Sequence, residues 1–170
     1  NLLPSDDTLS GFRTTIDEYM RRVIDLGHRV LAHLAASLGL PRDYFAARYT
    51  QDPLILFRIF QYPSVSTAVD AGDPNGPRYG VGEHTDYGLL TLLHQDTVGG
   101  LEVKTSASWI DAPPIPGSFV CNIGDMLDRM TAGYYKSTPH RVRINRSGRN
   151  RLSLPLFFDP NFDVRIEPIR

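Results

Sequence analysis

The sequence from residue 82 to residue 104 reads GEHTDYGLLTLLHQDTVGGLEVK, and this stretch indicates the fold most strongly. Two short runs of strand-forming residues, 89–93 and 101–104, are separated by a segment that ends in the glycine pair Gly99-Gly100. Glycine pairs between short apolar runs are typical of turns between strands. The stretch therefore predicts two successive strands, and the polar segment before them holds two residues able to bind a metal, His84 and Asp86.

Short strands are predicted on both sides of this stretch. Further runs of strand formers cover residues 54–60, 108–111, 118–122, 140–144 and 151–158. Residues 64–82 are polar and rich in glycine and proline, which predicts a long surface loop. Only residues 125–132 interrupt the later strands, with a helical turn or two. Many short strands separated by turns indicate an antiparallel sandwich or barrel.

The N-terminal part of the chain is different. Apolar residues recur at helical spacing over residues 9–38, and Gly39 marks the end of this long helix. A shorter helix is predicted over residues 42–48. Helices first and strands afterwards predict an α+β chain with a helical support region, residues 1–53, and a strand-rich core, residues 54–170.

The composition excludes several classes of protein. The chain has 170 residues, of which 41% are hydrophobic and 22% charged, as in ordinary globular proteins. The net charge is −1 and no segment concentrates Lys and Arg enough to follow a phosphate backbone, so we expect no nucleic-acid partner. No apolar run reaches the length of a membrane span, so we expect no membrane partner. The single cysteine, Cys121, favours a reducing, cytoplasmic location. The oligomeric state does not follow from the sequence.

Three residues are candidates for binding one metal ion. His84 and Asp86 are two positions apart, so both side chains point the same way in an extended strand. His140 lies at the start of another predicted strand. Two imidazoles and one carboxylate form the facial triad of non-haem Fe(II) oxygenases, which leaves metal positions open. Taken alone, a His-x-Asp pair equally fits a hydrogen-bonded pair that shapes a turn.

Arg151 and Ser153 are also two positions apart on one predicted strand. A dicarboxylate that chelates a metal through one end leaves its distant carboxylate to be bound by the protein. Arginine suits that task because it binds a carboxylate with two hydrogen bonds and stays charged when buried. The alternative is that Arg151 is one more surface arginine of the arginine-rich segment 141–151.

Several sequence blocks, taken in order, carry a resemblance to a known family. The blocks are HTD at 84–86, LTLLHQD at 90–96, GGLEV at 99–103, WI at 109–110, PGSFV at 116–120, NIGD at 122–125, YKSTPHRV at 135–142 and RLS at 151–153. Together they resemble the isopenicillin N synthase-like family of Fe(II)- and 2-oxoglutarate-dependent oxygenases, over about residues 57–160. The resemblance leads us to expect that this chain is shorter than complete members of that family at both ends.

The resemblance implies a fold and an activity. The fold is a double-stranded β-helix, or jelly roll, of mainly antiparallel strands, which we expect to be backed by the helix over residues 9–38. The activity is that of a dioxygenase that oxidises a small organic molecule by hydroxylation, desaturation or cyclisation. The cosubstrates are O2 and 2-oxoglutarate, which becomes succinate and CO2, and ascorbate is expected to support the reaction in vitro.

The resemblance also implies the roles of individual residues. The Fe(II) ligands are His84, Asp86 and His140, and the residues that hold 2-oxoglutarate are Arg151, Ser153 and Tyr62. Tyr87 and Phe158 are candidates for facing the substrate. Phe60 stands where many members have an asparagine, which removes one polar contact to the cosubstrate. Two alternatives stay open: an Fe(II) oxidase of the isopenicillin N synthase type that needs no 2-oxoglutarate, and an inactive metal-binding homologue.

Overall fold

The computed structural model describes residues 3–65 and 79–169. Contacts divide the chain into two compact units, Asn1–Leu54 with Pro160–Val164 and Ile55–Asp159 with Arg165–Arg170. The predicted domain division between residues 53 and 54 stays a prediction. Within the described ranges, no helix combines the length and the apolar character that a bilayer crossing requires.

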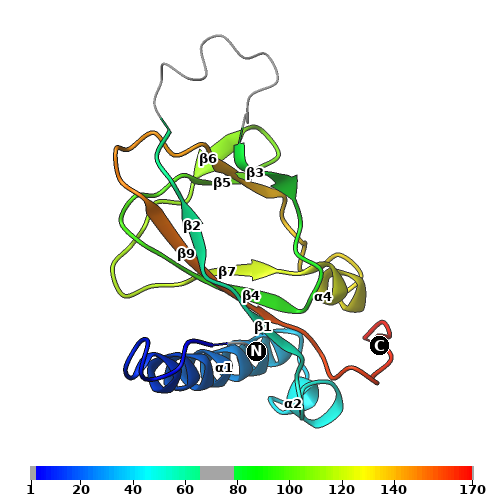
Figure 1. Ribbon diagram of the computed structural model, residues 1–170. Helices are drawn as coiled ribbons and strands as arrows, with labels where there is room; N and C mark the ends of the chain where they lie inside the picture. Colours follow the sequence, from blue (N-terminus) through cyan, green and yellow to red (C-terminus); the bar gives the residue numbers. More distant parts are fainter. Residues whose placement is uncertain (1–2, 66–78, 170) are drawn as a thin grey trace. The chain divides into compact units, whose positions relative to one another are not determined.

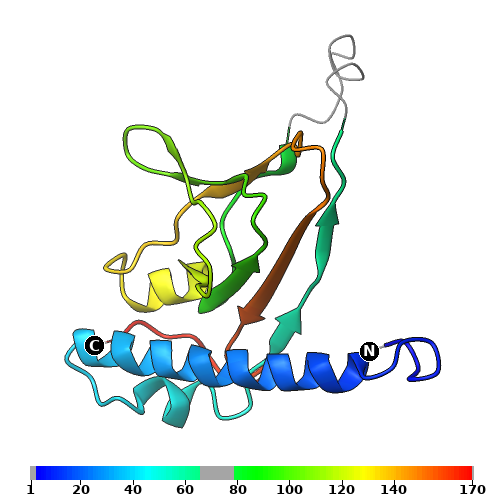
Figure 2. The ribbon, with the colours of Figure 1, turned by 90° about the vertical axis from the view of Figure 1, so that its left-hand side faces the viewer.

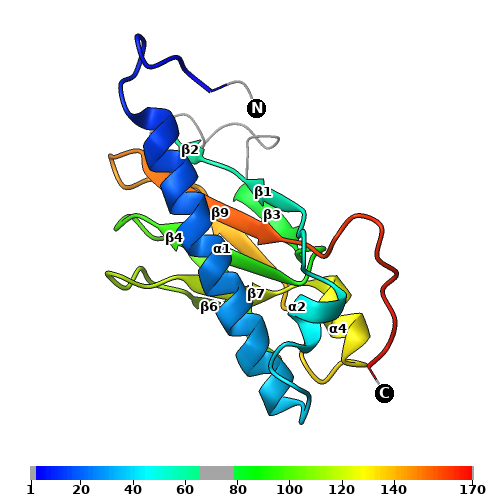
Figure 3. The same cartoon turned by 90° about the horizontal axis from the view of Figure 1, so that it is seen from below.

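The first unit contains the two predicted helices. Helix α1 (Phe12–Ser37) is unbroken and is followed by α2 (Tyr44–Arg48) (Figure 3). Helix α1 ends at Ser37, and Gly39 follows with a φ of +73° that favours glycine, while the Leu40 N–H donates to the Ala35 carbonyl at 2.9 Å. The buried residues of α1 recur every four positions on one face: Val23, Gly27, Leu31 and Ala35. The expectation that this face covers a sheet stays a prediction.

Among its described residues, the second unit contains two antiparallel sheets and one short helix (Figure 1). The first sheet contains β1 (Ile55–Phe57), β2 (Phe60–Tyr62), β4 (Leu90–Gln95), β7 (Val120–Ile123) and β9 (Arg151–Phe158). The second contains β3 (Tyr79–His84), β5 (Leu101–Lys104), β6 (Trp109–Asp111) and β8 (His140–Arg143). Helix α4 (Asp125–Met130) follows β7. The predicted α+β class with antiparallel strands is confirmed.

Strand β9 organises the first sheet, and it explains one difference from the prediction. Residues 54–60 were expected to form one strand, but β1 and β2 are separate and pair with successive parts of β9 (Figure 2). Pro155 of β9 lies opposite the break, and its carbonyl accepts a hydrogen bond from the Arg58 N–H at 3.0 Å. Since proline has no N–H to donate, the ladder cannot continue unchanged past this residue.

Strand β3 corrects a second prediction. Residues 64–82 were expected to form a loop, but Tyr79–His84 is a strand paired with β8, while residues 66–78 lie outside the described residues. A Cβ added at Gly80 would lie 3.2 Å from both the Arg143 carbonyl oxygen and the Tyr62 ring. Glycine in this strand therefore allows a close approach of neighbouring strands, rather than marking a loop.

The two sheets of the second unit share a hydrophobic core. Leu93 of the first sheet packs with Leu101 and Val142 of the second, and Tyr62 and Val81 pack against this cluster. The candidate site described next lies beside this core, with residues from both sheets.

Candidate functional site

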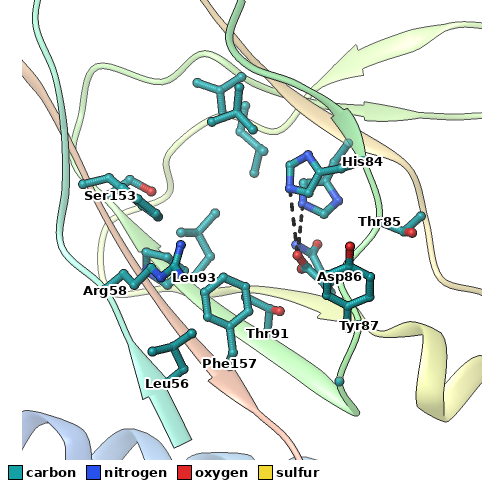
Figure 4. A pocket seen from close by; sticks show the side chains of 18 of the residues that line it. Leu56, Arg58, His84, Thr85, Asp86, Tyr87, Thr91, Leu93, Ser153 and Phe157 are labelled. Carbon is teal, nitrogen blue, oxygen red and sulfur yellow. Dashed lines mark hydrogen bonds and ion pairs between the residues drawn. The ribbon is translucent and has the colours of Figure 1, made fainter.

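The structure brings His84, Asp86 and His140 together. His84 ends β3 and pairs in register with His140 at the start of β8, so the two rings lie 4.3 Å apart between centroids. Asp86 follows β3, and its Oδ1 lies 3.9 Å from His84 Nε2 and 3.7 Å from His140 Nε2 (Figure 4). One ligand atom from each residue lies within 4.8 Å of the others. In the described part of the chain, this is the only such group of three metal-ligating side chains.

Backbone carbonyls orient both imidazole rings in the same way. Nδ1 of His84 lies 2.8 Å from the Gly82 carbonyl oxygen, and Nδ1 of His140 lies 3.1 Å from that of Thr138. A carbonyl can only accept a hydrogen bond, so each Nδ1 carries the proton in the neutral ring. The lone pair then remains on each Nε2, the nitrogen nearest Asp86. Such hydrogen bonds to the second ring nitrogen are usual for metal-binding histidines.

The segment that carries Asp86 is held by the start of α4. Asn122 Nδ2 donates to Asp86 Oδ2 at 3.3 Å, and the Asp125 N–H donates to the Asp86 carbonyl at 2.7 Å. A Cβ at Gly124 would overlap the backbone of Gly88, so only glycine permits this close crossing. The side chain of Asp86 is 5% exposed and that of His140 is 7% exposed, whereas that of His84 is 41% exposed. The candidate metal position is therefore reached from the His84 side.

Arg151 is buried, and two of its guanidinium nitrogens have no hydrogen-bond acceptor in the described structure. The residue is 1% exposed, and its Nη2 donates to Gln95 Oε1 at 3.1 Å. Its Nε and Nη1 are buried and have no hydrogen-bond partner among the described residues. The guanidinium lies 5.0 Å from the centroid of the Tyr62 ring, the residue paired with Arg151 in the β2–β9 ladder. Arg151 is therefore not a surface arginine. Unpaired buried donors are costly, so they indicate an absent acceptor.

Burial also shifts the pKa values of this pair. It lowers the pKa of the Arg151 guanidinium, although Tyr62 and Asp96 oppose the shift. It raises the pKa of the Tyr62 phenol, against the effect of the Arg151 charge. Arginine nevertheless stays charged at neutral pH, and the phenol stays protonated. Both side chains therefore remain hydrogen-bond donors for an anionic group.

A cavity of about 350 Å³ lies beside the candidate metal ligands. It is lined by the three candidate metal ligands together with Tyr62 and Ser153. Side chains of a strand alternate between two faces, so Arg151 lies on the same face of β9 as Ser153 and Phe157. Arg151 itself is not among the described residues that line the cavity, because it lies buried beyond the end of this row.

The two candidates for facing the substrate have different positions. Tyr87 lines the cavity and is 82% exposed (Figure 4). Phe158 is fully buried and does not line the cavity, whereas its neighbour Phe157 does. The reason is the alternation along β9, which turns Phe158 to the opposite face from Arg151 and Ser153. Because this alternation can be read from the sequence, it could have identified Phe157 as the candidate for facing the substrate.

Three further residues of the site were missed in the sequence. Arg58 and Asp159 line the cavity, and Asn122 contacts Asp86. Arg58 and Asp159 flank strands whose cavity-facing positions follow from the alternation, so a weak signal existed for both. Asn122 lies opposite Thr91 in the β4–β7 ladder, and no local pattern places it beside Asp86.

Comparisons with known proteins agree on one family. The family model described as "2OG-Fe(II) oxygenase superfamily" matches residues 45–160. A probable iron/ascorbate oxidoreductase of Dictyostelium discoideum is 58% identical over 161 residues, which cover 90% of this chain and 44% of that protein. A 1-aminocyclopropane-1-carboxylate oxidase of Dictyostelium mucoroides is 44% identical (91% of this chain, 48% of that protein). A homoarginine-6-hydroxylase of Glycine max is 42% identical (93% and 48%). The chain thus spans about half the length of these relatives.

A solved structure supports the same assignment. The crystal structure of a full-length Neurospora crassa protein in complex with alpha-KG superposes with a TM-score of 0.90 at 35% identity, covering 99% of this chain and 53% of that one. The predicted jelly-roll core and the resemblance seen in the sequence are thereby confirmed. The chain belongs to the 2OG-Fe(II) oxygenase superfamily.

Proposed function

We propose that the protein is an Fe(II)- and 2-oxoglutarate-dependent oxygenase that oxidises a small organic molecule. His84, Asp86 and His140 hold the iron, and Arg151, Ser153 and Tyr62 hold the distant carboxylate of 2-oxoglutarate. For a hydroxylation, the overall reaction converts substrate C–H, O2 and 2-oxoglutarate to the alcohol, succinate and CO2. When bound, the iron supplies the redox chemistry that activates dioxygen.

The observation that carries this proposal is the pair of unpartnered donors on Arg151. Nε and Nη1 are buried without a hydrogen-bond partner among the described residues. Tyr62, whose ring centroid lies 5.0 Å from the guanidinium, and Ser153, two positions along β9, both line the cavity. A carboxylate would accept both hydrogen bonds at once. The metal ligands and Ser153 line one cavity, and Arg151 lies on the same face of β9 as Ser153, so a dicarboxylate could reach both groups with its two ends.

The residues of the chain position the reactants rather than react themselves. The carbonyls of Gly82 and Thr138 hold the imidazoles in one tautomer, and Asn122 fixes one oxygen of Asp86. Apolar side chains such as Leu93 and Val142 line the cavity and limit the entry of water. These residues therefore fix the geometry of the site before the reactants bind.

The test is oxygen consumption and succinate formation by the complete protein with Fe(II) and ascorbate, with and without 2-oxoglutarate. The proposal expects succinate only when 2-oxoglutarate is present, and more of it when a substrate is added. Oxygen uptake that does not need 2-oxoglutarate would instead support an oxidase of the isopenicillin N synthase type. No uptake under either condition would support an inactive homologue.

The substrate and the cellular location also belong to this proposal. The relatives' names mention an amino acid with a cyclopropane ring and homoarginine, so amino acids are the first compounds to test. The location is proposed to be cytoplasmic, because the chain has a single cysteine and no pair to form a disulfide.

A further inference from the structure

The cavity extends beyond the groups that hold the cosubstrate. Side chains on the cavity face of β9 run from Ser153 through Pro155 to Phe157, and Asp159 follows directly after the strand. Ser153 belongs to the end near Arg151, so the part lined by Phe157 and Asp159 is left for another molecule. Leu56 and Tyr87 line the same part (Figure 4). This second part is the substrate region.

One cationic side chain lines the cavity. Arg58 lies at the break between β1 and β2, where its N–H donates to the Pro155 carbonyl at 3.0 Å. It is the one Lys or Arg among the described residues that line the cavity. Within residues 3–65 and 79–169, no carboxylate forms an ion pair with it, and its guanidinium lies 5.9 Å from the centroid of the Phe60 ring. Its charge is therefore available to an anionic group of a ligand.

A carboxylate lies at the other end of the region. Asp159 lines the cavity, and its Oδ1 is buried without a hydrogen-bond donor in the described structure. A Cβ at Gly88 would overlap the Asp159 carboxylate, so glycine at position 88 leaves room for it. Burial raises the pKa of Asp159, and the charge of Asp86 adds to the shift. A positively charged donor from a ligand would satisfy this carboxylate.

We infer that the substrate is a small linear molecule with a carboxylate at one end, bound by Arg58, and a basic nitrogen at the other, bound by Asp159. The backbone of Arg58 is hydrogen-bonded to Pro155, four residues before Asp159, so the two charged side chains enter the cavity from different positions along the chain. Leu56 and Phe157 also line the cavity and can pack against the carbon atoms between the two polar groups of the ligand. This inference rests on the proposed function, since it names the substrate class of the same site.

Three ligands distinguish the contribution of the Arg58 contact to binding from that of the Asp159 contact. L-Arginine has both groups, agmatine lacks the carboxylate, and L-citrulline replaces the guanidinium by a neutral urea of similar shape. Binding is measured by calorimetry without oxygen, on the complete protein loaded with Fe(II) and 2-oxoglutarate. The wild-type protein is expected to bind L-arginine about ten- to a hundredfold more tightly than either analogue, as for hydrogen bonds to charged groups.

Variants of the protein then show which side chain binds which end of the ligand. Arg58→Gln should remove the preference for L-arginine over agmatine, and Arg58→Lys should restore part of it. Asp159→Asn should remove the preference for L-arginine over L-citrulline. Arg149→Gln, which changes an exposed arginine outside the cavity, should retain both preferences. Thermal unfolding confirms that each variant is folded.

Two results would overturn the inference. The first is equal affinity of the wild-type protein for the three ligands, or no binding of any of them, while 2-oxoglutarate still binds. The second is a loss of 2-oxoglutarate affinity in Arg58→Gln, which would make Arg58 a cosubstrate residue. In both cases the proposed function stands, because it depends on 2-oxoglutarate binding by the wild-type protein, measured separately in the same experiment.

Discussion

His84 and His140 lie directly opposite one another in the β3–β8 ladder, with ring centroids 4.3 Å apart. Each ring is held through Nδ1 by the carbonyl two residues before it in the chain. The same local arrangement thus occurs on both strands, and it directs each Nε2 towards Asp86. Strand pairing therefore places two ligands that are far apart in the sequence, and the proposed metal site depends on the register of this ladder.

Asn122 is predicted to strengthen metal binding through Asp86. Replacing it by Ala removes the hydrogen bond from Nδ2 to Asp86 Oδ2, so the carboxylate is less well oriented. Loss of such an outer contact typically costs about 10–100-fold in metal affinity. The measurement is a competition titration of Fe(II) or Mn(II) against a chelator. Asn161→Ala is the control, because Asn161 belongs to the other compact unit, and it should leave the affinity unchanged. Equal affinities for Asn122→Ala and the wild type would contradict the prediction.

Arg151 is predicted to determine the affinity for 2-oxoglutarate and not for the metal. Arg151→Gln leaves the bound carboxylate without its cation, which costs roughly 2–5 kcal/mol, or on the order of 30- to several-thousand-fold. Ser153→Ala should cost less, about 1.5–3 kcal/mol, because it removes one hydrogen bond to a charged group. Equilibrium dialysis with labelled 2-oxoglutarate measures both. A normal affinity in Arg151→Gln would remove the cosubstrate assignment and leave the metal site in place.

Gly124 is predicted to be required for folding. An added Cβ would overlap the backbone of Gly88, which cannot rotate away as a side chain can. Gly124→Ala should therefore lower the free energy of unfolding by about 1–3 kcal/mol, as overpacking usually does. Gly82→Ala is the matched control, because nothing lies within 4 Å of its Cβ position, and it should not destabilise the protein. The measurement is the free energy of unfolding of both variants in urea. Equal values would show that the backbones of Gly88 and Gly124 are not tightly packed against each other.

The stability of the metal-free protein is predicted to depend on pH through Asp159. Burial, and then the charge of Asp86, raise the pKa of this carboxyl above its ordinary value of 3.8. The folded state thus holds the proton more tightly than the unfolded state. Stability from this group is therefore fully present below about pH 3.8 and is lost as the pH rises through the raised pKa. Asp159→Asn should gain stability relative to the wild type as the pH rises through this range to neutrality. A difference that stays constant across the range, measured by urea unfolding, would refute the assignment.

The sequence contained enough information to predict the candidate metal site and most of the strands. The periodicity of two in a strand pairs His84 with Asp86 and Arg151 with Ser153. In the structure His84, Asp86 and Ser153 line the cavity, and Arg151 is buried on the same face of β9 as Ser153. The choice of Phe158 as a candidate rests only on its place at the end of the last strand, whereas Phe157 continues the row of cavity-facing residues in β9. The alternation along the strand is sufficient to distinguish the two positions.

Other features depend on contacts that no local pattern contains. The glycines of β3 resemble those of a loop, and only the close approach of Arg143 and Tyr62 explains Gly80 in a strand. The division of β1 from β2 depends on Pro155, which lies far along the chain. The contact of Asn122 with Asp86 likewise joins distant residues. Such features follow from tertiary packing, so they became visible only in the structure.

The most direct test of the central claim is a titration of 2-oxoglutarate into the Fe(II)-loaded protein without oxygen, followed by the visible metal-to-ligand charge-transfer band. The band requires iron in the site and 2-oxoglutarate chelated to it. We expect a saturable band in the wild type and in His94→Gln, since His94 contacts the Phe119 ring and is outside the group of candidate ligands. We expect no band in His140→Ala. A wild type without the band, or a band of equal strength and affinity in His140→Ala, would contradict the account.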